Sequence, residues 1–63
     1  MKKSDLFEYL DGFSFVSFDE IQMAVNDFFV EKMYVFNPSY SDLMYYQTLA
    51  SEYMLAKNYN FTN

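Results

Sequence analysis

Apolar residues recur at the three- and four-residue spacing of an α-helix in three segments of the chain, and residues that end helices separate these segments. In the first segment, Leu6, Phe7 and Leu10 share one helix face. We expect Ser4 to cap this helix and Gly12 to end it in a left-handed conformation. A helix this short is marginal alone, so we expect it to dock on the other two.

The second segment has the clearest helix start in the sequence. Ser17 and Glu20 have the spacing of a capping box, and Val16 and Ile21 have that of a hydrophobic staple. These signals predict a helix from residue 18 to about residue 34. Its apolar arc, at about 100° per residue, consists of Phe18, Ile21, Ala24, Val25, Phe28, Phe29 and Phe36, with the stem of Lys32 beside them.

Pro38 interrupts the helical pattern, because the residue before a proline avoids the helical region. We expect a third helix to begin between residues 37 and 41 and to run to about residue 58, with Ser39 and Asp42 as a second capping box. The tail that follows either folds back through Phe61 or frays. The main apolar arc of this helix consists of Leu43, Tyr46, Leu49, Ala50, Tyr53 and Met54.

These elements predict an all-α fold, a compact three-helix domain that comprises residues 1–63. The alternative is an α+β fold. Residues 13–16 alternate with period two and residues 33–36 are rich in β-prone side chains, so the two segments could pair as short strands. Two strands alone are marginal in water, which favours the helical prediction.

The composition argues against catalysis. The 63 residues include no His, Cys, Trp or Arg, but seven Tyr, eight Phe and five Met. His and Cys are the side chains that most often carry acid–base, nucleophilic and transition-metal chemistry near neutral pH. Carboxylate pairs such as Asp27 and Glu31 lack a histidine or a calcium loop, so we interpret them as solvated acids. We therefore predict a protein that is not an enzyme and has no metal site and no cofactor.

The charge balance predicts the kind of partner. The chain has nine acidic residues and four lysines, and two of these lysines, Lys2 and Lys3, lie at the N-terminus. An acidic surface is repelled by phosphate, so we expect no direct nucleic acid binding and a basic protein as partner. No apolar run is long enough to span a bilayer, and Asp5 and Glu8 interrupt any signal-peptide core, which predicts no membrane and a cytoplasmic location.

The second predicted helix carries an additional apolar stripe outside its main arc. An apolar centre with an acidic rim is typical of a docking surface for a basic protein. The alternative is that this stripe is further core, covered by the first helix or by a second copy of the chain. The predicted partner-binding residues are Met23, Val30 and Tyr34, flanked by Glu20, Asp27 and Glu31.

The third predicted helix also places apolar side chains outside its main arc, namely Met44, Tyr45 and Leu55. Such a set is an aggregation liability unless it is covered, and a symmetric second copy is the simplest cover. We therefore expect these residues to support self-association as a homo-oligomer. Tyrosines half-buried with the hydroxyl in water are the alternative explanation.

These observations predict a non-enzymatic, stoichiometric protein-binding module. The chain is similar in size and charge to small acidic phage inhibitors of restriction, repair and CRISPR enzymes, a resemblance of composition without a shared motif. That resemblance implies an inhibitor whose partner is a nucleic-acid-binding enzyme. Two alternatives are a self-assembling helical module and a nucleic-acid mimic, since acids on successive helical turns have a spacing comparable to that of backbone phosphates.

Overall fold

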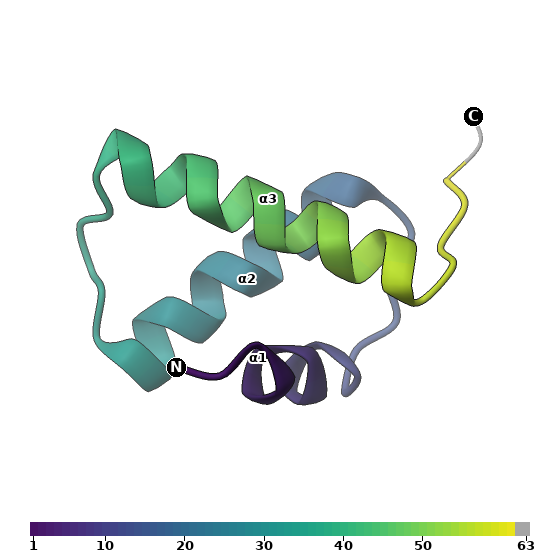
Figure 1. The fold of residues 1–63 in the computed structure, drawn as a ribbon, viewed down its shortest axis with the longest axis horizontal. Coiled ribbons are helices and arrows are strands. Elements are labelled where there is room, and N and C mark those ends of the chain that lie inside the picture. The colour runs from purple at the N-terminus through teal and green to yellow at the C-terminus, as the bar shows by residue number, and fades with distance from the viewer. Residues whose placement is uncertain (62–63) are drawn as a thin grey trace.

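Three helices form the fold, which confirms the all-α prediction. The computed structural model describes residues 1–61 and contains α1 (Lys3–Leu10), α2 (Phe18–Met33) and α3 (Tyr40–Ala56). Over these residues there is no strand, so the alternative with strands at 13–16 and 33–36 is wrong. In Figure 1, α2 crosses behind α3 from the upper right of the view to the lower left, and α1 lies below them. The end of the predicted tail, residues 62 and 63, lies outside the described part.

Aromatic side chains from all three helices fill the core. Phe29 of α2 stacks on Tyr46 of α3 with ring centroids 4.3 Å apart. Phe7 of α1 meets Tyr53 of α3 edge to face at 5.2 Å. Each such side chain stabilises the fold by about 1.5–3 kcal/mol when fully buried. The buried set is Leu6, Leu10, Phe15, Ile21, Ala24, Val25, Phe28, Phe29, Tyr46, Leu49, Ala50 and Tyr53.

Side-chain caps fix where α2 and α3 begin. At α3 the predicted capping box is complete, because the Ser39 hydroxyl accepts from the Asp42 N–H at 3.1 Å and the Asp42 carboxylate accepts from the Ser39 N–H at 3.0 Å. At α2 the Ser17 hydroxyl accepts from the Glu20 N–H at 3.2 Å. The Glu20 carboxylate, however, accepts from the N–H of Val16 at 2.9 Å, so it turns one residue further back than in a standard box.

Both caps predicted for α1 are wrong, although the helix ends at Leu10. Lys2 is the N-cap residue and makes no side-chain capping bond, so Ser4 lies inside the helix. Gly12 is not left-handed, because its N–H bonds to the Tyr9 carbonyl at 3.2 Å in a tight turn that continues from the helix. The left-handed residues among those described are Tyr34, with φ 57°, and Asn58, with φ 62°.

Some predicted core residues lie at the surface. Val16 is 77% exposed, so the staple with Ile21 does not form, and Phe15 is buried in its place. Phe36 is 66% exposed, because the helix ends at Met33 and the chain leaves the periodicity that put Phe36 on the inner arc. Lys32 is also exposed, and Leu43 is about half exposed.

The three helices meet along three seams, and polar contacts close one of them. Lys3 of α1 pairs with Glu52 of α3, and Lys57 after α3 pairs with Asp11 after α1 at 3.2 Å. Both ion pairs among residues 1–61 therefore lie on the α1–α3 seam. The α2–α3 and α1–α2 seams are open grooves at their outer sides.

Replacing Ser39 by Ala should destabilise the fold by about 1 kcal/mol, because the start of α3 loses its side-chain acceptor. The measurement is urea unfolding followed by far-ultraviolet circular dichroism. Ser41→Ala, an exposed substitution within the first turn of the same helix, is the matched control and should change stability much less. Equal losses in both variants would contradict the assigned cap.

Candidate functional site

Much apolar surface of this chain is not covered by its own fold. Among residues 1–61, the large apolar side chains at least 39% exposed are Met1, Phe13, Val16, Met23, Met33, Tyr34, Phe36, Tyr40, Leu43, Met44, Tyr45 and Leu55. Isolated exposed apolar side chains are normal on proteins, whereas a contiguous group in a concavity marks a binding site. The question is therefore which of these side chains lie together.

A concave surface lies on the outer side of the α2–α3 seam, where it forms a groove of about 760 Å³. Its floor includes the buried Tyr46 ring, which the stacked Phe29 holds in place. Met23 from α2 and Met44 from α3 line it and are 67% and 49% exposed. We call this surface the α2–α3 groove. It is lined by Asp19, Gln22, Met23, Asn26, Asp27, Tyr40, Leu43, Met44, Tyr46 and Gln47.

The charges around the α2–α3 groove have one sign. Asp19 and Asp27 of α2 lie on it, and no lysine is among its described lining residues. Lys3 and Lys57 are held on the α1–α3 seam by their ion pairs. Lys32 lies on the α1–α2 groove instead. The result is an apolar, thioether-lined groove in a negative field.

The groove unites residues from both faces that the sequence predicted. Met23 and Asp27 come from the predicted partner-binding stripe, and Met44 comes from the predicted self-association set. The prediction placed these residues on two separate surfaces because a helical pattern describes one helix at a time. α2 and α3 cross each other (Figure 1), and their packing brings the two faces to one groove.

Other predicted contact residues lie elsewhere. Val30 is half-buried, and Tyr34 is 75% exposed at the left-handed end of α2, out of line with the stripe. Tyr45 lies beside the Phe29 ring at 6.3 Å, and Leu55 is 74% exposed near the far end of α3. These residues do not line the groove.

Two of the predicted rim acids have structural partners within the chain. Glu20 accepts the Val16 N–H in the α2 cap, and Glu31 accepts the Tyr9 hydroxyl at 2.8 Å. The Glu31 hydrogen bond, with burial, raises the pKa of Tyr9 to about 12. The acids left facing the α2–α3 groove, Asp19 and Asp27, are about 12 Å apart along the axis at 1.5 Å per residue. The groove itself therefore does not present an acid on every helical turn.

Sequence reasoning assigned only Met23, Asp27 and Met44 of the lining residues to a binding surface. Tyr40, Leu43 and Gln47 complete the α3 wall of the groove, and Tyr40 is 78% exposed. A signal was present, because Tyr40, Met44 and Gln47 recur at helical spacing outside the main arc. The periodicity of α3 predicts Leu43 to be a core residue, but Leu43 lines the groove.

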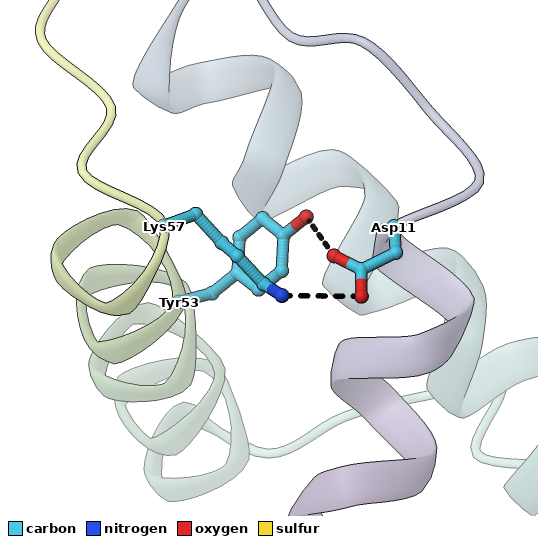
Figure 2. Close-up of polar contacts among 3 residues, drawn as sticks. All are labelled: Asp11, Tyr53 and Lys57. Carbon is cyan, nitrogen blue, oxygen red and sulfur yellow. Dashed lines mark hydrogen bonds and ion pairs between the residues drawn. The ribbon is translucent and has the colours of Figure 1, made fainter.

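A second polar cluster joins the ends of α1 and α3. Figure 2 shows the Tyr53 hydroxyl and the Lys57 ammonium converging on the two carboxylate oxygens of Asp11, at 2.8 Å and 3.2 Å. The Tyr53 hydrogen bond and then the Lys57 contact lower the pKa of Asp11 below its usual range. Burial, with the Asp11 hydrogen bond, raises the pKa of Tyr53 well above its usual range.

This cluster acts as a clamp between helices. The Tyr53 ring is 2% exposed and is packed against Phe7 and Phe15, so its hydrogen bond to Asp11 ties the end of α1 to the core. Over residues 1–61 there is no group of three potential metal ligands among His, Cys, Asp and Glu. In the same part of the chain no helix is long and apolar enough to cross a bilayer.

No protein-family model matches the sequence, and no curated protein or solved structure is significantly similar to it. A functional interpretation therefore depends on the groove itself, its lining side chains and its charges.

Replacing Asp11 by Asn should remove an acid-sensitive contribution to stability. The lowered pKa of Asp11 means that its contribution is present above about pH 4, the ordinary range of an aspartate, and is lost as the pH falls through the lower folded value. Asp11→Asn should therefore be less stable than the parent at neutral pH, and the gap should close as the pH falls through the lowered pKa of Asp11.

The measurement is thermal unfolding of both proteins across the acid range. Glu8→Gln, which removes an exposed acid on α1, is the control and should keep the pH dependence of the parent. A constant gap between Asp11→Asn and the parent at all pH values would show that the ionised carboxylate is not the stabilising group.

Proposed function

We propose that this protein is a non-enzymatic binding module that docks on a larger, basic protein through the α2–α3 groove. The observation that carries the proposal is the exposure of Met23 and Met44 on the two walls of one concave surface. Solvent-exposed thioethers of this kind are costly to leave in water, and methionine is frequent at surfaces that adapt to a partner.

The charge distribution supports a basic partner. The chain has a formal net charge of −5, and Asp19 and Asp27 flank the groove without a lysine beside them. Complementary charges mainly raise the association rate and select against acidic competitors, while the apolar contacts supply most of the affinity. A stoichiometric binder needs both contributions and no reactive group.

Inhibition is the form of action that we propose for such binding. Size and acidity are the properties that this chain shares with phage-type inhibitors of nucleic-acid enzymes. Enzymes that bind nucleic acid carry basic surfaces, which an acidic groove can cover. The host enzyme would then be blocked by contact, in the cytoplasm, at one inhibitor per site.

The proposal is tested by capturing partners from the native cell with the parent protein and with Met23→Glu/Met44→Glu. We expect a basic protein that the parent retains and the double variant loses, because each buried apolar anchor contributes on the order of 2 kcal/mol. The purified partner should bind the parent at a fixed stoichiometry and, if it is an enzyme, lose activity in proportion.

Val16→Glu/Leu55→Glu is the matched control. It adds the same charge at two apolar positions that are 77% and 74% exposed and lie outside the groove. This control should retain the partner. Equal retention by both double variants, or equal loss, would rule out the groove as the docking site.

A second candidate function, self-assembly as a homodimer, is favoured by the loop between α2 and α3. Residues 33–41 contain no charged side chain, and Tyr34, Phe36 and Tyr40 are each at least 66% exposed. Two copies of an uncharged aromatic loop can meet without like-charge repulsion. Pairing through the α2–α3 groove is disfavoured, because a two-fold axis through it would bring its acids close together.

Tyr34→Gly discriminates between a structural and a contact role for this loop. Tyr34 is left-handed, a conformation that costs a non-glycine residue about 1–2 kcal/mol and that glycine adopts freely. The variant should therefore keep or slightly raise the free energy of unfolding and weaken any dimer. Sedimentation over a dilution series measures the second effect. A parent protein that is monomeric at every concentration would exclude the homodimer.

A further inference from the structure

We infer that the partner segment bound in the α2–α3 groove is an amphipathic helix with basic flanks. This inference rests on the proposed function and specifies the chemistry of the occupant. It follows from the shape of the seam, from its side chains and from the position of its acids.

The seam has the shape that receives a helix. α2 and α3 pack against each other through Phe29 and Tyr46, and α1 packs on the side of α2 that carries Phe28. Asp19 and Met23 lie on the side of α2 away from Phe28. The outer side of the helix pair is therefore without a third helix, and side-chain ridges of an added helix can fit the groove between two packed helices.

The length of the groove agrees with a short helix. Its α2 wall extends from Asp19 to Asp27, about 12 Å at 1.5 Å per residue, or about two helical turns. Two turns offer two or three apolar side chains on one face at i, i+3 or i+4 and i+7. A strand could not add to an edge here, since residues 1–61 form no sheet.

The side chains that line the groove can contact apolar residues in the middle of a bound helix and cationic residues along its margin. Met23, Leu43 and Met44 supply adaptable apolar contact. Asp19 and Asp27 lie two turns apart on one wall. Lysine or arginine residues one or two turns apart along the flank of a bound helix can therefore meet both acids.

The α1–α2 groove provides an internal comparison. It is smaller, about 560 Å³, and it is also lined by methionine and acids, in this case Met33, Asp5 and Glu8. Lys32, however, lies on it and offsets the negative field. A basic helix should therefore prefer the α2–α3 groove, and this preference is measurable because each groove has its own methionines.

The test uses a synthetic peptide of about four helical turns, with leucines on one face, lysines on its flanks and one tryptophan. The protein has no Trp, so peptide fluorescence reports binding directly. Methyl NMR of the five methionines reports the location. We expect the peptide to become helical and the signals of Met23 and Met44 to shift, while those of Met1, Met33 and Met54 stay in place.

Two further comparisons test the chemistry. A peptide with glutamate in place of lysine, and one with the same composition in scrambled order, should bind at least about tenfold more weakly. Asp19→Asn/Asp27→Asn should weaken the basic peptide by roughly fivefold at low salt, as expected for two exposed ion pairs. Asp5→Asn/Glu8→Gln removes the same charge from the α1–α2 groove and should weaken it much less.

The inference is overturned if the scrambled peptide binds equally well, if Met33 shifts in place of Met23 and Met44, or if no methionine shifts at saturating peptide. In each of these cases the capture experiment with Met23→Glu/Met44→Glu still decides the proposed function separately. A partner lost specifically from that variant would keep the groove as the docking site and exclude a basic helix as its occupant.

Discussion

Tyr53 is where segments distant in the sequence meet, and the arrangement of the three helices depends on how it is held. Its ring packs edge to face against Phe7 of α1 and Phe15 of the following loop. Its hydroxyl donates to Asp11 at 2.8 Å, so a buried polar group has its partner. A leucine there could fill the core but could not tie the end of α1 to α3. The polar tip of a buried tyrosine therefore fixes the position of the short helix.

This clamp also determines where positive charge can lie. Lys57 completes the Asp11 site and Lys3 pairs with Glu52, so two of the four lysines are held on the α1–α3 seam. Exposed ion pairs of this kind contribute little to stability. Their larger consequence is for the field around the molecule, because the α2–α3 seam on the other side has acids and no counter-charge of its own. The ion pairs on the α1–α3 seam thus hold two lysines away from the α2–α3 seam, which stays negatively charged.

Local signals in the sequence predicted most of the fold but only part of the candidate site. The Ser39 cap and the apolar arcs depend on residues a few positions apart, so periodicity and capping rules are sufficient to find them. Phe36 was assigned to the core because a helical wheel assumes that the helix continues, whereas the chain becomes left-handed at Tyr34. Glu31 was assigned to the rim because a pattern within one helix cannot reveal its hydrogen bond to Tyr9, which is 22 positions away. Which acid stays available is a tertiary property that no single-helix pattern contains.

The two uncovered surfaces differ in the partner that each can accept. In an isologous contact the same surface of both copies is in contact, so a surface with Asp19 and Asp27 brings like charges together. The electrostatic repulsion between these charges increases as they are buried. The loop with Tyr34 and Phe36 has no such conflict. If both proposed contacts form, a basic partner at the groove and a second copy at the loop would share only Tyr40, which belongs to both surfaces. Pairing through the loop would then place two acidic grooves on one particle, and a partner with two basic sites would gain avidity that neither groove has alone.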